Sequence, residues 1–322
     1  MAHSAQGREL FGKVVTVVGG SGFFGQHLAQ ELLARGARLR IASRNPQRAF
    51  RVKPLGNLGQ VQFVRCDATR PESLGPALAG SDAVVNLIGA FSGNLDAIQG
   101  TGAGKIAAAA RAAGATAFVH VSAIGADADS RVDYARTKAE GEQAVLAAFP
   151  GATILRPSLL FGSDDNFIMM FARLIASFPA LPVFAPEAKL QPVFVDDAAE
   201  AVANVLADAG KQGRTYEIGG PEVITMLELN QRIATAQGRN RSLIELPDAA
   251  STVIATLGNF LPGMPITRDQ YELLKAGSVT SDSYPGLADL GVTPRPLGLF
   301  LDRWMVSFRK HGRFGESETA PR

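Results

Sequence analysis

The chain has 322 residues, of which 46% are hydrophobic and 19% are charged, and its formal net charge is +2. This composition is typical of a soluble globular protein with room for a large buried core, and it excludes a disordered chain. The small net charge gives no electrostatic reason to expect a nucleic acid partner. The single cysteine, Cys66, excludes an internal disulfide and fits a reducing compartment.

The N-terminal residues show no export signal. Residues 1–10 (MAHSAQGREL) contain no apolar stretch of the kind that a signal peptide needs. The longest apolar region, Phe167–Phe184, has Arg173 in its middle, followed by Pro179 and Pro182, so we do not expect it to span a membrane. The sequence therefore predicts a cytoplasmic protein without a transmembrane segment.

Apolar runs alternate with helical patterns through the first half of the chain. The predicted strands are Val14–Val18, Leu39–Ser43, Val61–Cys66, Ala83–Ile88, Phe118–Ser122 and Thr153–Leu155. The predicted helices are Phe24–Ala34, Ile98–Ala113 and Asp133–Ala147. Strands separated by helices favour right-handed crossovers and a parallel sheet covered on both faces. The sequence therefore predicts an α/β fold with a doubly wound parallel sheet, the Rossmann architecture.

This alternation loosens after Pro157, where prolines become frequent. A strand-like stretch at Tyr216–Gly220 and a helical pattern at Leu227–Ala236 follow. We expect a smaller C-terminal lobe that binds a substrate or a partner and returns some elements to the sheet. The predicted division is a dinucleotide-binding domain over residues 1–160, the smaller lobe over 161–311, and a disordered tail over 312–322.

A glycine-rich turn joins the first predicted strand to the first helix. Gly19, Gly22 and Gly25 form a G-x-x-G-x-x-G pattern within the segment GGSGFFG. Such a turn needs one glycine to bend sharply, one to let the backbone approach a pyrophosphate, and one to pack the helix on the strand. The helix N-terminus then offers free N–H groups to the phosphates. This context favours a dinucleotide site over a glycine-rich turn that binds no ligand.

The end of the second predicted strand, IASRNPQR, bears on the choice of cofactor. Arg44 stands where an Asp or Glu would receive the 2′-hydroxyl of NAD, and Arg48 follows one turn later. Arginine binds a 2′-phosphate through paired hydrogen bonds, so we predict NADPH in preference to NADH. The alternative is that Arg44 is a solvated surface residue. Asp67, past the third strand, either accepts a hydrogen bond from the adenine or caps a helix near Thr69.

Ser122, Tyr134 and Lys138 form a candidate catalytic set. The fifth predicted strand ends at Ser122, and Tyr134 and Lys138 lie at i and i+4 on one face of the next helix. A tyrosine can move the carbinol proton during hydride transfer, while a nearby lysine ammonium lowers the tyrosine pKa and also binds ribose. The serine would hold the substrate oxygen. The four histidines have no metal-ligand spacing, so we predict no metal site.

Seven motifs together resemble those of extended or atypical short-chain dehydrogenases/reductases. They are GGSGFFG at Gly19–Gly25, NLIG at Asn86–Gly89, HVSAIG at His120–Gly125, YARTK at Tyr134–Lys138, LRPSLLFG at Leu155–Gly162, QPVFVDDAAEAV at Gln191–Val202 and YEIGGPEVITMLEL at Tyr216–Leu229. Within that superfamily the chain is most similar to the Rossmann-type accessory subunit of respiratory complex I (NADH:ubiquinone oxidoreductase) in its bacterial form.

The resemblance implies a tightly bound NADPH without established turnover. It also implies a peripheral place beside the quinone-reducing module, on the cytoplasmic face of the inner membrane. By the same resemblance, Phe23, Phe24, Lys138 and Pro157 contribute to cofactor binding. Two other interpretations stay open: an active NADPH-dependent reductase or epimerase with Tyr134 as acid/base, and a redox-sensing regulator that binds the cofactor without turnover.

Two stretches in the second half are candidates for contact with a membrane or a partner. An apolar stripe at helical spacing either lies on a membrane surface or, as we favour, packs in the core; its residues are Val253, Ile254, Leu257, Phe260 and Leu261. A basic and aromatic helix near the C-terminus either anchors at an interface or packs on the domain; it contains Arg303, Trp304, Phe308, Arg309 and Lys310.

Overall fold

The computed structural model describes residues 9–258, 266–310 and 312. The chain divides into two compact units, and each unit is assembled from separate segments of the sequence. Unit 1 comprises Met1–Pro157, Val195–Ile218 and Thr280–Thr293. Unit 2 comprises Ser158–Phe194, Gly219–Val279 and Pro294–Arg322.

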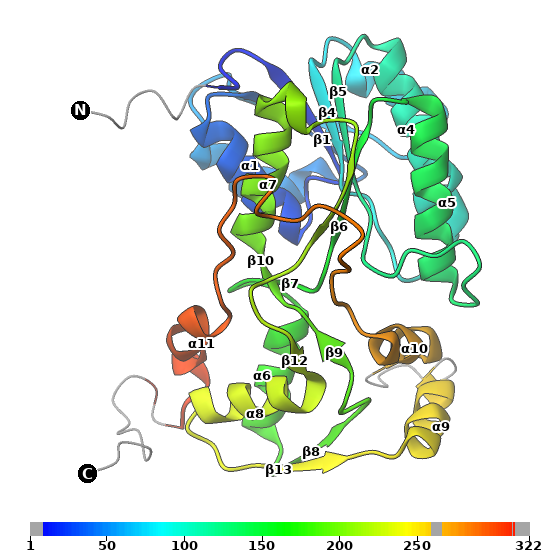
Figure 1. The fold of residues 1–322 in the computed structure, drawn as a ribbon. Helices are drawn as coiled ribbons and strands as arrows, with labels where there is room; N and C mark the ends of the chain where they lie inside the picture. Colours follow the sequence, from blue (N-terminus) through cyan, green and yellow to red (C-terminus); the bar gives the residue numbers. More distant parts are fainter. Residues whose placement is uncertain (1–8, 259–265, 311, 313–322) are drawn as a thin grey trace. The chain divides into compact units, whose positions relative to one another are not determined.

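Unit 1 is built on a seven-stranded parallel sheet with the strand order β11-β6-β5-β4-β1-β2-β3 (Figure 1). The strands are β1 (Val14–Val18), β2 (Arg38–Ser43), β3 (Val61–Arg65), β4 (Ala83–Asn86), β5 (Ala117–Val121), β6 (Thr153–Pro157) and β11 (Thr215–Ile218). The α-helices are α1 (Phe23–Ala34), α2 (Leu74–Leu78), α3 (Leu95–Gln99), α4 (Thr101–Ala112), α5 (Asp133–Ala148) and α7 (Val195–Ala207). Short 3₁₀ helices are η1 (Pro46–Leu55), η2 (Pro71–Ser73) and η3 (Ala209–Lys211). The predicted doubly wound fold is confirmed.

Helices cover both faces of this sheet, which explains why its central strands are apolar throughout. The helices α1 and α7 pack together on one face, while α4 and α5 pack on the other (Figure 1). Every residue of β4 and β5 is buried. Phe118 of β5 packs with Ile106 of α4 and Val145 of α5 in one core cluster. Burial on both faces leaves no alternation of polar and apolar residues along such strands.

The predicted helix over Ile98–Ala113 is wrong in one respect, because the structure has two helices there. Gly100 lies between α3 and α4 with φ −81° and ψ −103°, which is not a helical conformation. Its N–H donates to the carbonyls of Leu95 and Asp96 and closes α3. The side chain of Asp96 then accepts a hydrogen bond from the N–H of Thr101, where α4 begins.

In its described residues, unit 2 contains three two-stranded sheets instead of one large sheet. They pair β10 with β7, β12 with β9 and β13 with β8. The strands are β7 (Leu160–Phe161), β8 (Ala180–Val183), β9 (Lys189–Leu190), β10 (Val193–Phe194), β12 (Ile224–Thr225) and β13 (Ser242–Glu245). The helices are α6 (Phe167–Ser177), α8 (Met226–Ala236), α9 (Asp248–Gly258), α10 (Arg268–Ala276), α11 (Gly298–Trp304) and η4 (Met305–Phe308).

The two stretches considered for membrane or partner contact lie in unit 2. Of the apolar stripe, Val253 is exposed and Ile254 is half-buried in α9, whereas Phe260, Leu261 and the Leu257 side chain lie outside the described residues. None of the helices in the described ranges has both the length and the apolar character that a membrane crossing requires.

The C-terminal basic and aromatic segment packs on α8 in unit 2. Met305 of η4 is fully buried. Arg309 donates to the carbonyl of Ala236 at 3.1 Å, and Arg239 donates to the carbonyl of Phe308 at 2.9 Å. Of the two predicted roles for this segment, the structure shows packing on the domain.

Candidate cofactor site

The glycine turn has one sharp bend, one open position and one close contact. Gly19 has φ +83°, in the left-handed region that favours glycine. A Cβ atom on Gly25 would lie 2.5 Å from the backbone of Gly20, so only glycine lets α1 approach the turn this closely. A Cβ atom on Gly22 would meet only the Gly19 carbonyl oxygen, at 3.7 Å. The turn therefore leaves space at Gly22, where the backbone must admit a pyrophosphate.

The N-terminus of α1 is free to bind an anion. Gly22 is the N-cap residue, so no side chain caps the first N–H groups, and the first turn has no acidic residue. These N–H groups and the helix dipole favour a phosphate. Phe24 is buried in the core, and Phe23 meets the edge of His27 at 5.2 Å between ring centroids. A hydrogen bond of 2.5 Å joins His27 to Asp196 of α7 and holds this part of α1 in place.

The predicted cofactor residues lie at one edge of the sheet. The strand order reverses between β1 and β4, and ligands of doubly wound sheets bind beyond the carboxyl ends of the strands at such a point. Because the strands are parallel, residues that follow different strands are brought to the same edge. Those residues are Gly19 after β1, Arg44 after β2, Asp67 after β3, Ser122 after β5 and Pro157 at the end of β6.

The residues beyond β2 and β3 offer a positive charge at this edge. Arg44 and Arg48 are exposed, and within the described residues no hydrogen bond or ion pair engages the Arg44 guanidinium. Asp67 accepts hydrogen bonds from the N–H and the hydroxyl of Thr69 at 3.0 and 2.8 Å. Burial acts to raise the pKa of Asp67, but these hydrogen bonds and the charge of Arg44 lower it below its usual value. The carboxylate of Asp67 thus caps a local turn at Thr69.

Lys138 is held at the ends of β4 and β5. Its side chain is buried, and the Nζ atom donates to the carbonyl oxygens of Val121 at 3.1 Å and Ile88 at 3.4 Å. Burial lowers the pKa of Lys138 to about 8, although the nearby Glu142 acts in the opposite direction. The Nζ atom also lies 6.0 Å from the centroid of the Tyr134 ring.

Tyr134 and Ser122, the other two members of the candidate catalytic set, lie near this lysine. The Tyr134 ring stacks on Phe91, with the centroids 4.5 Å apart, and burial raises the pKa of Tyr134 to about 12. The prediction that Lys138 lowers this pKa is wrong for this structure, because desolvation of the phenol dominates. The Ser122 hydroxyl is buried without a hydrogen-bond partner among the described residues.

Sequence reasoning missed a buried polar network that shapes the loop after β4. Asn86 donates to Nδ1 of His120 at 3.1 Å and accepts from the N–H of Ile88 at 3.1 Å. Gln99 is fully buried and accepts from the N–H of Ala90 at 3.0 Å. Burial lowers the pKa of His120 to about 3, so the ring is neutral. Asn86 and His120 belong to the NLIG and HVSAIG motifs, and the hydrogen bond between them gives a structural reason for these two motif residues.

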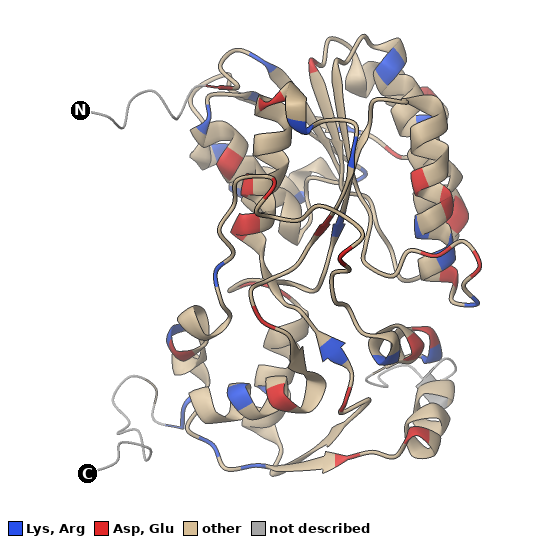
Figure 2. Ribbon diagram, viewed as in Figure 1, with Lys and Arg blue, Asp and Glu red and all other residues tan. Residues whose placement is uncertain are grey.

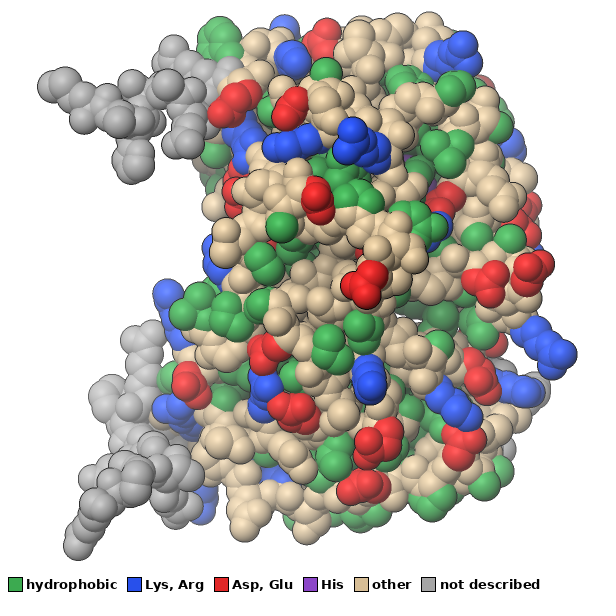
Figure 3. Space-filling model, viewed as in Figure 1, with side chains coloured by type: hydrophobic (Ala, Val, Ile, Leu, Met, Phe, Trp, Pro, Cys, Tyr) green, Lys and Arg blue, Asp and Glu red, His purple; other side chains and the backbone are tan. Residues whose placement is uncertain are grey.

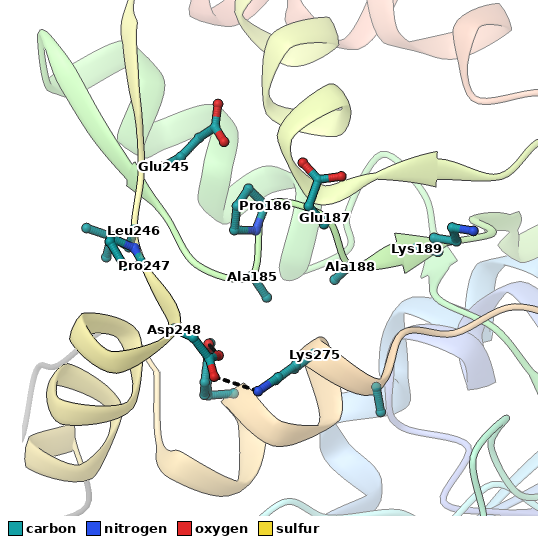
Figure 4. A pocket seen from close by; sticks show the side chains of 12 residues that line it. Ala185, Pro186, Glu187, Ala188, Lys189, Glu245, Leu246, Pro247, Asp248 and Lys275 are labelled. Atoms are coloured by element: carbon teal, nitrogen blue, oxygen red, sulfur yellow. Dashed lines mark hydrogen bonds and ion pairs between the residues drawn. The ribbon is translucent and has the colours of Figure 1, made fainter.

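Two pockets lie wholly within the described residues of unit 2 and include no residue of the glycine turn. The larger, of about 770 Å³, is bordered by the segments 185–189 and 245–248 and by one face of α10 (Figure 4). Asp248 accepts a hydrogen bond from Tyr271 at 2.5 Å and forms an ion pair with Lys275 at 2.7 Å. Asp248, Tyr271 and Lys275 thus satisfy one another. The smaller pocket, of about 410 Å³, lies between α6 and η4.

Two family models match the chain in overlapping regions. The model described as NAD(P)H-binding matches residues 19–166, which include the glycine turn and the Ser122, Tyr134 and Lys138 set. The model described as the RmlD substrate binding domain matches residues 128–255. Triphenylmethane reductase of Citrobacter sp., solved as a complex with NADP(H), has a similar fold. It matches with a TM-score of 0.73 and 23% identity over 90% of this chain and 99% of its own.

Curated relatives match along nearly the whole chain. The mitochondrial NADH dehydrogenase (ubiquinone) 1 alpha subcomplex subunit 9 of Arabidopsis thaliana is 31% identical over 95% of this chain and 81% of its own length. The protein of the same name from Rattus norvegicus is 32% identical over 92% of this chain and 81% of its own length. The chain therefore belongs to the family of NADH dehydrogenase (ubiquinone) 1 alpha subcomplex subunit 9, which is an atypical short-chain dehydrogenase/reductase family with an NAD(P)H-binding domain.

Proposed function

We propose that the protein is an accessory subunit of respiratory complex I that binds NADP(H) chiefly as a structural ligand. The observation that carries this proposal is the extent of the similarity, which runs through unit 2 as well as through the Rossmann unit. Similarity confined to the sheet would support only dinucleotide binding, because that fold serves many functions. Unit 2 would then supply contacts to other subunits of the complex, at a peripheral position beside the quinone-reducing module on the cytoplasmic side of the membrane.

The residues around β2 favour NADPH over NADH as the bound dinucleotide. No aspartate or glutamate occurs between Glu31 and Asp67, so the end of β2 has no carboxylate for a ribose 2′-hydroxyl. Arg44 is exposed there, and the preceding Ser43 has a buried hydroxyl without a partner among the described residues. A guanidinium and a hydroxyl are the donors that a 2′-phosphate needs. The glycine turn would hold the pyrophosphate, and Lys138 would hold the ribose of the nicotinamide.

The geometry around Tyr134 supports a structural role for the cofactor. A bound nicotinamide supplies a hydride in the reductases of this superfamily, and a tyrosine there moves the accompanying proton. Tyr134 has a pKa of about 12, which makes it a poor general base near neutral pH. Its ring also stacks on Phe91, and Lys138 is already bonded to two backbone carbonyls. This arrangement favours a role in ordering the site over a role in proton transfer.

An active NADPH-dependent reductase is the second candidate, because Ser122, Tyr134 and Lys138 are all present in unit 1. The unpartnered Ser122 hydroxyl is the specific observation that favours it, since such a group is free to bind a substrate oxygen. Proposed catalytic roles would be oxygen binding for Ser122, proton transfer for Tyr134 and electrostatic support for Lys138.

Purification of the tagged protein from gently solubilised source membranes distinguishes these proposals. The accessory subunit would co-purify with complex I subunits and release stoichiometric NADPH on denaturation, as identified by mass spectrometry. A free protein that loses its nucleotide on washing, and that oxidises NADPH in the presence of carbonyl compounds, would contradict the proposal and establish the reductase.

A further inference from the structure

The segment at the β3 edge of the sheet in unit 1 has a concentrated positive charge. Between Glu31 and Asp67 the chain has eight arginine and lysine residues and no aspartate or glutamate, although the net charge of the whole chain is only +2. This segment includes β2, η1 and β3, and β3 is the last strand of the sheet. Arg35 pairs with Glu31, and Arg40 donates to the carbonyl of Ala79. The exposed cations of η1 and of the two residues between β2 and η1 are Arg44, Arg48, Arg51 and Lys53.

Within this segment, η1 presents apolar side chains to solvent beside its cations. Ala49 and Val52 are buried, and they define the face of η1 that packs on the unit. The opposite face and the following loop expose Phe50 by 52%, Leu55 by 49% and Leu58 by 107%. Arg51 and Lys53 are exposed between these residues. We call this set the η1 edge; it comprises Phe50, Arg51, Lys53, Leu55 and Leu58.

Packing holds the η1 edge in a defined position. Phe50 meets Phe63 of β3 in a T-shaped contact with the ring centroids 5.1 Å apart. The 3₁₀ helix also contacts α1 and β2. Leu58 stands in the loop between η1 and β3, close to Gly59, which has φ +79°. The apolar side chains are thus displayed by an ordered element and are not the product of a loose end.

The cations of the η1 edge have no carboxylate partner. Within the described residues, no hydrogen bond or ion pair engages the side chains of Arg51 and Lys53. By contrast, Arg136 pairs with Asp133 and Glu140 on α5, and Arg232 pairs with Glu228 on α8 (Figure 2). Charges of both signs are also mixed across the face shown in Figure 3. The η1 edge therefore keeps an uncompensated positive potential.

We propose that the η1 edge binds the surface of a bilayer that contains anionic phospholipids. Unpaired cations attract anionic headgroups, and neighbouring apolar side chains enter the boundary between headgroups and acyl chains. A fully exposed leucine at the tip of a loop suits a fluid lipid phase, which needs no preformed pocket to receive it. The surface is separate from the proposed 2′-phosphate contact at Arg44, and bilayer binding does not depend on assembly into complex I.

Sedimentation of the purified full-length protein with vesicles tests this proposal. The protein is expected to bind vesicles made of phosphatidylcholine and phosphatidylglycerol, and not to bind vesicles made only of phosphatidylcholine. It should dissociate from the anionic vesicles as the salt concentration is raised. Arg51→Gln with Lys53→Gln removes two cations and should weaken binding on the order of thirtyfold. Leu55→Ser with Leu58→Ser should weaken it roughly tenfold.

A matched control changes one cation and one leucine on the opposite face of the sheet. Lys105 on α4 and Leu146 on α5 are both exposed, so Lys105→Glu with Leu146→Ser should bind the vesicles as the native protein does. Thermal unfolding and NADPH binding of each variant verify that the fold is intact. The same weakening in the control would contradict the proposal. The proposal would also be contradicted if the native protein did not bind vesicles while the η1 edge variants no longer co-purified with complex I. In that case the η1 edge would bind an acidic protein surface.

Discussion

Unit 1 and unit 2 differ in how their strands are buried, and this difference decides how much of each is visible in the sequence. The sheet of unit 1 has strands of four to six residues, and β4 and β5 are buried along their whole length. Strands of this kind appear in the sequence as uninterrupted apolar runs between helices. In unit 2 four of the six strands have only two residues, so hydrophobic periodicity has no length over which to appear.

The two units also differ in what their residues contribute. The glycine turn, Arg44 and the buried Lys138 all belong to unit 1, where the parallel sheet brings residues from distant positions to one edge. Unit 2 has short sheets, mutually paired charges such as Asp248 and Lys275, and an aromatic stack in which the rings of Phe194 and Phe300 lie 4.2 Å apart. We therefore expect substitutions at the sheet edge of unit 1 to affect nucleotide binding most. Equivalent changes in unit 2 should leave nucleotide binding unchanged.

The largest expected effect is that of Gly25→Val. A Cβ atom there would lie 2.5 Å from the Gly20 backbone, which cannot rotate aside as a flexible side chain could. We expect a loss of about 3 kcal/mol in the free energy of unfolding, together with loss of nucleotide binding. Urea unfolding and NADPH titration measure the two effects.

Two control substitutions separate the effect of the Gly25 clash from that of adding a side chain to any glycine. Gly22→Ala meets no close atom, so it should keep the stability and lose only affinity for the nucleotide. Gly298→Ala in unit 2 also has open space and should affect neither quantity. If Gly25→Val left binding intact, the glycine turn would not be the nucleotide site.

The next effect concerns the choice between NADPH and NADH. Arg44→Asp removes a cation and places a carboxylate near the proposed 2′-phosphate, so NADPH binding should fall roughly a hundredfold or more. NADH binding should change little, because NADH has only a hydroxyl at that position. Calorimetric titration with both cofactors gives the ratio of affinities. Arg303→Asp, which reverses an equally exposed arginine in unit 2, serves as the control. Equal losses for both cofactors would rule out the 2′-phosphate contact.

A third prediction uses the depressed pKa of Lys138. Burial lowers this pKa from 10.5 in the unfolded chain to about 8 in the folded protein. Between these pH values the unfolded chain binds more protons, so the free energy of unfolding rises with pH. Between pH 8 and pH 10.5, the free energy of unfolding of the native protein should rise by about 3 kcal/mol relative to that of a Lys138→Met variant.

Urea unfolding at several pH values checks the Lys138 prediction. The control in unit 2 is Lys275→Met, because the ion pair with Asp248 raises the pKa of Lys275 instead of lowering it. Lys275 therefore stays protonated in both states across the lower part of this window and adds no slope there. A native protein with the same pH dependence as Lys138→Met would show that Lys138 is not buried as described.

Particular residues show where sequence reasoning succeeded and where it could not. The turn at Gly19 and the placement of Lys138 after β5 follow from local patterns, because a sharp bend and an i, i+4 spacing depend on near neighbours. The raised pKa of Tyr134 depends on burial and on stacking with Phe91, which is distant in sequence. The hydrogen bonds of Asn86 with His120 and of Gln99 with Ala90 likewise join residues that are distant in sequence or lie in different elements. Contacts of this kind have no periodic signal in one sequence.

The smallest expected effect is that of Tyr134→Phe, and it tests whether the site of unit 1 is structural. The substitution removes only the hydroxyl and keeps the ring that stacks on Phe91. If the cofactor is a structural ligand, stability should change by less than about 0.5 kcal/mol, and NADPH content and co-purification with complex I should be unchanged. Phe91→Ala serves as the matched comparison, because it removes the stacking partner while leaving the hydroxyl. The opposite result would be that the native protein oxidises NADPH in the presence of a carbonyl compound and that Tyr134→Phe abolishes this activity. Tyr134 would then be a catalytic residue, and the cofactor would be a reactant instead of a structural ligand.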